Sequence, residues 1–222
     1  MMRLVMFDCD GTLVDSQYVI TDSMQAAFKL RGLPPPSGEA VKRIVGLSLP
    51  EAIGRLHGES DTVLIDSLVA VYKEAFLDLR ASKNLHEPLF ADVEETLSEL
   101  EEAGYILGVA TGKTRRGLLA TLETHGLGKY FITLQTADVA PGKPHPGMLQ
   151  RAMAETGAAK GETVLIGDTV FDIEMAVNAG TCAYGVSWGY HEVDELHAAG
   201  ADLVLDHLSE LPPLLAQTQK GV

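Results

Sequence analysis

The 222-residue chain contains little cysteine, few aromatic residues and a shortage of positive charge. Its two cysteines, Cys9 and Cys182, lie among apolar residues, so we interpret them as core residues in a reducing compartment and not as a disulfide. The net charge of −14 argues against nucleic acid or an anionic membrane as a partner. No apolar run is long enough to cross a membrane, and Asp8 interrupts the N-terminal run before a signal-peptide core could form. We therefore expect a cytoplasmic protein, and the sequence leaves its oligomeric state open.

From about residue 100 onward, short apolar runs alternate with amphipathic segments. The runs that predict strands are 104–111, 130–139, 163–168, 181–188 and 201–206, and the segments that predict helices are 114–126, 146–157, 170–180, 191–200 and a broken helix at 207–215. Strand–helix alternation with apolar strands is typical of a doubly wound α/β fold, in which helices cover both faces of a parallel sheet. Residues 3–7 are expected to form a further strand of the same sheet.

Residues 16–84 follow a different pattern, because no strand is predicted in them. Ile20, Met24 and Phe28 recur at helical spacing, and a second apolar stripe begins at Ile65. A short helix is expected at 37–46, and Ser48 with Glu51 has capping-box spacing at the start of another. We therefore predict an α/β core made of residues 1–15 and 85–222, with an all-helical insertion at 16–84.

Polar residues follow four of the predicted strands where each strand ends. They are Asp8, Asp10, Gly11 and Thr12; Thr111, Gly112 and Lys113; Lys143; and Asp168 with Asp172. Ligands of open parallel sheets bind beyond the carboxyl ends of the strands, so we expect these residues to converge at one edge. Two carboxylates one residue apart at the end of a buried strand repel each other unless a cation or a reaction requires them.

Four short motifs occur in a fixed order: D-x-D-G-T-L-V at 8–14, Thr-Gly at 111–112, Lys-Pro-x-Pro at 143–146 and G-D-x-x-x-D at 167–172. Together they resemble the haloacid dehalogenase-like hydrolase superfamily, and the resemblance covers essentially the whole chain. The helical insertion is similar to the helical cap domain that some members carry after the first motif. Within the superfamily, the chain most resembles phosphoglycolate phosphatases and related small phosphatases.

The resemblance and the residue chemistry together imply a Mg²⁺-dependent phosphatase with an aspartyl-phosphate intermediate. Asp8 is the expected nucleophile, and Asp10 the expected acid and base. The Asp8 carboxylate, the Asp10 backbone carbonyl and the Asp168 carboxylate are the expected Mg²⁺ ligands, with Asp172 as a further ligand or an anchor.

Other residues at the strand ends are expected to hold the phosphoryl group. Gly11, with Thr12 beside it, lets the backbone approach closely, and Thr111 with the amides of Gly112 and Lys113 binds phosphoryl oxygens. Lys143 is expected to screen the nucleophile and the transferred group.

The cap is expected to set the substrate, a small phosphorylated metabolite, with 2-phosphoglycolate as the specific candidate. The cap residues expected to face the site include Arg43 and Lys73, whereas Arg115 and Arg116 of the core are interpreted as a solvated helix face. Pyrophosphate, a sugar phosphate and a β-phosphoglucomutase-like reaction remain alternatives within the superfamily. Halide chemistry is disfavoured, since Asp10 occupies a position that the dehalogenases do not keep acidic. A phospho-accepting signalling domain is the alternative of another class, disfavoured because the paired acids lie on the first strand and a helical insertion follows them.

Overall fold

The computed structural model describes residues 3–58, 61–81 and 87–219. Six strands form one sheet in the order β3-β2-β1-β4-β5-β6, and every neighbouring pair is parallel. The strands are β1 Leu4–Phe7, β2 Ile106–Thr111, β3 Phe131–Thr136, β4 Thr163–Gly167, β5 Cys182–Val186 and β6 Leu203–Leu205. The predicted α/β fold is confirmed, and β1 lies at the centre, where the strand order reverses.

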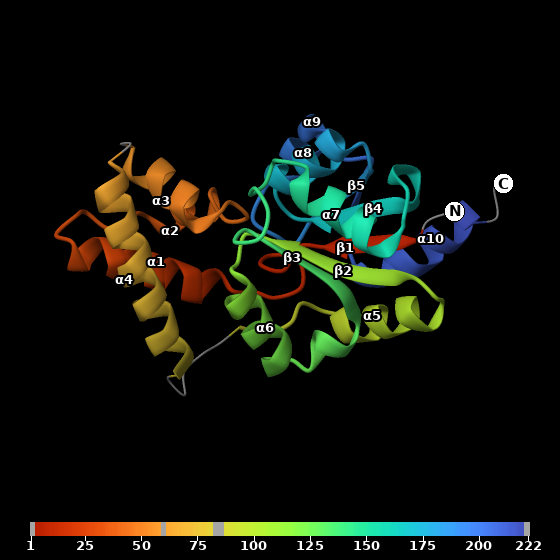
Figure 1. Cartoon of the computed structure of the whole chain (residues 1–222), viewed down its shortest axis with the longest axis horizontal. Coiled ribbons are helices and arrows are strands. Elements are labelled where there is room, and N and C mark those ends of the chain that lie inside the picture. Colours follow the sequence, from red (N-terminus) through yellow and green to blue (C-terminus); the bar gives the residue numbers. More distant parts are fainter. Residues whose placement is uncertain (1–2, 59–60, 82–86, 220–222) are drawn as a thin grey trace.

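Helices cover both faces of the sheet (Figure 1). One face packs against α7 Gly147–Thr156, α8 Val170–Ala179 and α9 Val193–Ala199, and the other against α5 Val93–Glu102, α6 Arg115–Thr124 and α10 Leu211–Gln219. Short 3-10 turns at Leu127–Lys129, Lys160–Glu162 and Leu208–Glu210 complete the connections. The sequence pattern did not predict α5.

The central strand is apolar on both sides because both sides are buried. Val5 and Phe7 contribute to the apolar cluster on one face of the sheet, and Leu4 and Met6 to the cluster on the other. All four side chains are fully buried. This double burial holds the end of β1 rigidly where the first acidic motif begins.

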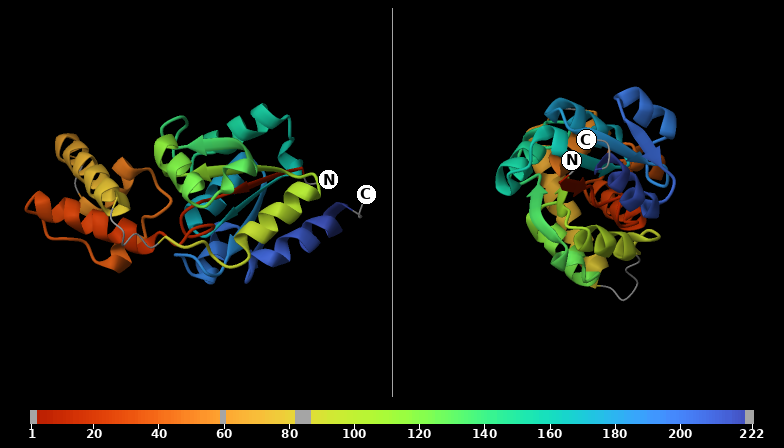
Figure 2. Two further views of the ribbon diagram at one scale, coloured as in Figure 1. Left: turned by 90° about the horizontal axis from the view of Figure 1, so that it is seen from below. Right: turned by 90° about the vertical axis from the view of Figure 1, so that its right-hand side faces the viewer.

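The remaining helices, here called the cap helices, lie to one side of the sheet (Figures 1 and 2). They are α1 Gln17–Leu30, α2 Gly38–Lys42, α3 Leu49–His57 and α4 Thr62–Ala81. They bury an apolar cluster of their own, to which Phe171 at the start of α8 also contributes. Ser48 precedes α3, but its side chain makes no capping hydrogen bond, so the predicted capping box does not form.

The chain enters and leaves the cap helices at one place. Val14 and Leu89 form an antiparallel bridge, the Asp15 amide donates to the Pro88 carbonyl at 2.9 Å, and the Phe90 amide donates to the Leu13 carbonyl at 3.0 Å. The start of the predicted insertion, at residue 16, lies next to this pairing, and its predicted end, at residue 84, lies outside the described residues.

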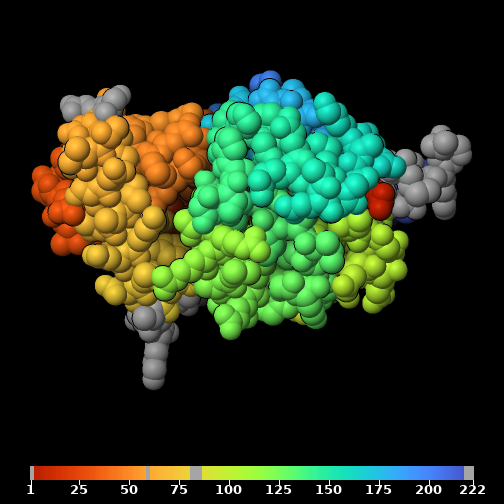
Figure 3. Space-filling model, in the orientation of Figure 1, coloured from red at the N-terminus to blue at the C-terminus, as the bar shows by residue number. Residues whose placement is uncertain are grey.

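In the space-filling view the cap helices lie directly against one end of the core (Figure 3). Among the described residues, no helix combines the length and the apolar character needed to cross a membrane.

Candidate active site

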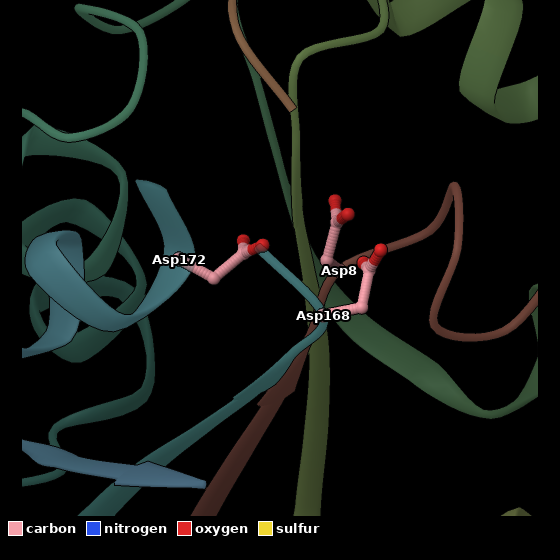
Figure 4. Close-up of side chains that lie close together, drawn as sticks. All are labelled: Asp8, Asp168 and Asp172. Carbon is pink, nitrogen blue, oxygen red and sulfur yellow. The ribbon is translucent and has the colours of Figure 1, made fainter. Parts of the chain in front are cut away.

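Three buried carboxylates meet at the carboxyl ends of β1 and β4. Asp8 directly follows β1, Asp168 directly follows β4, and Asp172 lies in the first turn of α8. One oxygen of each lies within 4.8 Å of the others, and each side chain is 1% exposed or less. Figure 4 shows Asp172 directed from α8 toward the other two. The predicted convergence of these strand ends is therefore present in the structure.

Neighbouring groups fix two of the three carboxylates. Asp168 accepts hydrogen bonds from the Thr12 hydroxyl at 2.9 Å and from the Tyr190 amide at 3.0 Å. Asp172 Oδ2 accepts from the amide and the hydroxyl of Thr169, at 3.2 and 2.6 Å. Asp8 Oδ2 accepts no hydrogen bond within the described part of the chain. The Asp8 carboxylate therefore keeps an oxygen free for a cation or for attack on a substrate.

Lys143 supplies the positive charge at the centre of the cluster. Its Nζ lies 2.6 Å from Asp8 Oδ1 and 2.6 Å from Asp172 Oδ1, and its side chain is fully buried. Burial opposes the charged form of this amine, but the two carboxylates outweigh burial and raise the Lys143 pKa above its usual value. The lysine therefore stays protonated and joins the β3–α7 loop to the end of β1.

One ammonium does not compensate three buried acids. Burial is the main cause that raises the pKa of Asp8 from 3.8 to about 7. The Lys143 ammonium lowers this pKa, but the negative charges of Asp172 and Asp10 oppose its effect. Burial, with Asp8 and Asp172, also raises the pKa of Asp168 well above its usual value. Such a cluster is short of positive charge, and a divalent cation among the oxygens would hold the carboxylates ionised.

Asp10 forms a second, separate ion pair. Its Oδ1 lies 2.8 Å from Lys113 Nζ and also accepts a hydrogen bond from the Ser16 hydroxyl. Burial of the Lys113 amine is outweighed by Asp10, so the Lys113 pKa is raised. Ser16 is the residue before α1, yet its side chain bonds to Asp10 and does not cap the helix. The sequence did not indicate either contact.

Two glycines allow close approach of the backbone. Gly11 has φ +91°, and a Cβ there would collide with Asp168 and with the ring of Tyr190. A Cβ on Gly112 would collide with the carbonyl oxygen of Leu47 and lie 2.8 Å from that of Gly46, both in the loop between α2 and α3. The loop after β2 therefore touches the backbone of the cap directly.

A cavity of about 340 Å³ lies between the edge of the sheet formed by the carboxyl ends of the strands and the cap helices. Its core side contains Asp8, Asp10, Thr111, Gly112, Lys113, Thr114, Arg116, Gly117 and Ala120. Its cap side contains Ile20, Met24, Ile44, Val45, Gly46, Leu47, Leu49, Ala52, Tyr72, Lys73, Phe76, Leu77 and Arg80. Asp8 and Asp10 thus open into a space large enough for a small organic ligand.

The structure places some candidate residues away from their expected positions. Arg43 does not line the cavity, because its guanidinium forms a bidentate ion pair with Glu195 of α9, with both N···O distances 2.6 Å. The Thr12 hydroxyl is bound to Asp168. Lys73 lines the cavity as expected, and so does Arg116, which the sequence pattern assigned only to a solvated face.

The Lys113 amide, expected to bind a phosphoryl oxygen, donates to the Thr111 hydroxyl at 3.2 Å. Gly112, whose amide is also expected to bind a phosphoryl oxygen, lines the cavity.

Known proteins are similar to this chain in sequence and in fold. Residues 5–186 match the family described as haloacid dehalogenase-like hydrolase. The chain belongs to this family. It is 37% identical to the "probable phosphatase IndB" of Dickeya dadantii, over 95% of this chain and 92% of that protein. It is 34% identical to the phosphoglycolate phosphatase of Vibrio parahaemolyticus, over 97% and 96% of the two chains.

The fold is also that of solved structures in the family. A predicted phosphatase from Clostridium acetobutylicum superposes on 98% of this chain and 99% of its own, with a TM-score of 0.87 at 24% identity. The family and its named phosphatases make the protein a hydrolase of the phosphatase type.

Proposed function

We propose that the protein hydrolyses a small phosphomonoester through a phosphoryl intermediate on Asp8. The observation that carries the proposal is the position of Asp8 and Asp10, which line the same cavity from the end of the central strand. A buried carboxylate with a free oxygen can attack phosphorus, and a second carboxylate beside it can exchange protons with the leaving group and with water.

The proposed first step breaks the ester bond. Asp8 Oδ2 forms a bond to phosphorus as the bond to the leaving oxygen breaks, and Asp10 gives that oxygen a proton. In the second step Asp10 takes a proton from water, which attacks the same phosphorus and releases phosphate and the free Asp8 carboxylate. Lys113 and Ser16 hold Asp10 Oδ1, so they would keep its carboxylate directed toward the leaving group.

The donor set fits a hard divalent cation. Opposite oxygens around Mg²⁺ are separated by about 4 Å, close to the 4.8 Å limit within which the oxygens of Asp8, Asp168 and Asp172 lie. We propose that these carboxylates and the backbone carbonyl of Asp10 hold Mg²⁺. The bound ion would neutralise phosphoryl charge and keep Asp8 ionised.

Phosphoryl oxygens also need donors from the protein. We propose that the Thr111 hydroxyl, the Gly112 amide and the Lys143 ammonium supply them. Thr111 ends β2 and Gly112 follows it, beside β1, and the Lys143 ammonium lies 2.6 Å from Asp8 Oδ1. Gly11 would keep the backbone close to the metal ligands, and Thr12 would act through Asp168.

We propose residues 16–84 as the cap domain, residues 1–15 with 85–222 as the core, and the cytoplasm as the compartment.

The named relatives supply 2-phosphoglycolate as the first specific substrate to test. Phosphate release would be measured for 2-phosphoglycolate, pyrophosphate, sugar phosphates and p-nitrophenyl phosphate, each with Mg²⁺ and with EDTA. We expect release that requires Mg²⁺ and is abolished in Asp8→Asn, with Asp22→Asn on the exposed surface of α1 as the control. Full activity in EDTA, or in Asp8→Asn, would reject the proposed mechanism.

A further inference from the structure

The cap side of the cavity is almost entirely apolar. Side chains from three cap helices line it, among them Met24 of α1, Leu49 of α3, and Tyr72 and Phe76 of α4. The last two rings stack on one another, with centroids 5.9 Å apart. Lys73 and Arg80 are the charged cap residues in the lining as described, and the Tyr72 hydroxyl is the polar group among the remaining cap side chains.

One of those two cations is already engaged. Arg80 donates to the Thr124 hydroxyl at 3.2 Å, lies 3.8 Å from the Glu87 carboxylate and stands 6.0 Å above the Phe76 ring. Lys73 is exposed. Apart from Lys73 and Arg80, the cap side of the cavity therefore offers few polar contacts to a leaving group.

This lining discriminates between classes of leaving group. A sugar carries several hydroxyls, and burying them against hydrocarbon without hydrogen-bond partners is unfavourable. The cap lining provides no amide, carboxylate or aliphatic hydroxyl side chain among the described residues. Glycolate is small and has little apolar surface to bury against this lining. An apolar leaving group would instead gain free energy from each part that it buries.

We propose that the natural substrate is the phosphate ester of an alcohol with an apolar body, which packs against Met24, Leu49 and Phe76. This proposal rests on the phosphatase mechanism above and names the leaving group of that reaction. Asp8 and Asp10 share the cavity with these side chains, so a phosphoryl group at Asp8 places the alcohol under the roof. The volume of about 340 Å³ is at the lower end of the roughly 300–1,000 Å³ of pockets that hold small organic ligands.

A series of unbranched alkyl phosphates, from methyl to pentyl, tests the proposal. Their leaving alcohols have similar acidity, so differences in kcat/KM report contacts of the alkyl chain. We expect kcat/KM to rise about fourfold with each added methylene until the cavity is filled, and benzyl phosphate to exceed both 2-phosphoglycolate and sugar phosphates. A flat series, or a preference for 2-phosphoglycolate or a sugar phosphate, overturns the inference and leaves the phosphatase mechanism intact. Absence of Mg²⁺-dependent release from every ester overturns the mechanism itself.

A matched pair of variants locates the contact. Phe76→Leu shortens an aromatic side chain that lines the cavity, and Phe28→Leu makes the same change in the buried cap cluster away from it. We expect Phe76→Leu to reduce the pentyl-to-methyl ratio of kcat/KM by about threefold, and Phe28→Leu to leave the ratio unchanged. Equal pentyl-to-methyl ratios in both variants and the wild type would show that the alkyl chain of the substrate does not pack against α4, and would overturn the proposal.

Discussion

The Asp8 carboxylate should make the metal-free protein less stable as the pH rises. In the folded state burial raises its pKa from 3.8 to about 7. Between these two values the folded protein binds a proton that the unfolded chain has released, so the free energy of unfolding falls as pH increases. The loss is complete once the pH exceeds the folded pKa. At 1.36 kcal/mol for each pKa unit, the difference amounts to about 4 kcal/mol.

The substitution Asp8→Asn removes the charge and keeps the shape of the side chain. We expect the variant to be inactive and, in EDTA, more stable than the wild type by about 2 kcal/mol at pH 5 and about 4 kcal/mol at pH 8. This gain is a large part of the 5–15 kcal/mol that typically holds a domain folded.

Denaturant-induced unfolding at both pH values, in EDTA and in excess Mg²⁺, measures the effect. In Mg²⁺ the advantage of Asp8→Asn should shrink, because the wild type gains the free energy of metal binding. Asp22→Asn, an exposed substitution, should stay within about 0.5 kcal/mol of the wild type throughout. If the gap between Asp8→Asn and the wild type does not widen from pH 5 to pH 8, burial does not control the charge of this carboxylate.

Two further changes test the ion pairing and the contact with the cap. Lys143→Met removes the ammonium shared by two buried carboxylates and should lower the free energy of unfolding in EDTA by about 3–5 kcal/mol. Chemical denaturation measures this loss. An equal loss in Lys129→Met, at an exposed lysine, would contradict the argument. Gly112→Ala places a Cβ against the carbonyl oxygen of Leu47 and should lower kcat/KM about 100-fold by holding the cap away, with little change in thermal stability. Steady-state kinetics and thermal unfolding check the second prediction, and unchanged kinetics would refute it.

The strands and the acidic motifs were predictable because both depend on local sequence. Double burial makes each central strand a continuous apolar run, and strand ends collect polar residues. The helix α5 was missed although Val93, Leu97 and Leu100 are buried at helical spacing, because acidic residues dominate its sequence. The helical spacing of its apolar residues lies between the predicted insertion and the first strand–helix alternation, where neither pattern is clear.

Contacts across the cavity were not predictable, because they depend on how the cap sits on the core. Arg43, the residue after α2, pairs with Glu195 of α9, which is 152 residues further along the sequence. Arg116 lies on a polar helical face, and only the position of the cap turns that face into part of a cavity. Ser16 carries the signature of a helix cap, and the nearby Asp10 carboxylate competes for its hydroxyl.

The pairing of the two chain segments at the base of the cap helices has an evolutionary consequence. Val14 and Leu89 meet in a bridge, so the two ends of the segment between them lie side by side on the core. Segments of different lengths can connect these two positions. A different helical unit could be exchanged there without altering the strand order or the acidic residues at the strand ends. Within one scaffold, the helical segment can therefore change while the acidic residues at the strand ends stay in place.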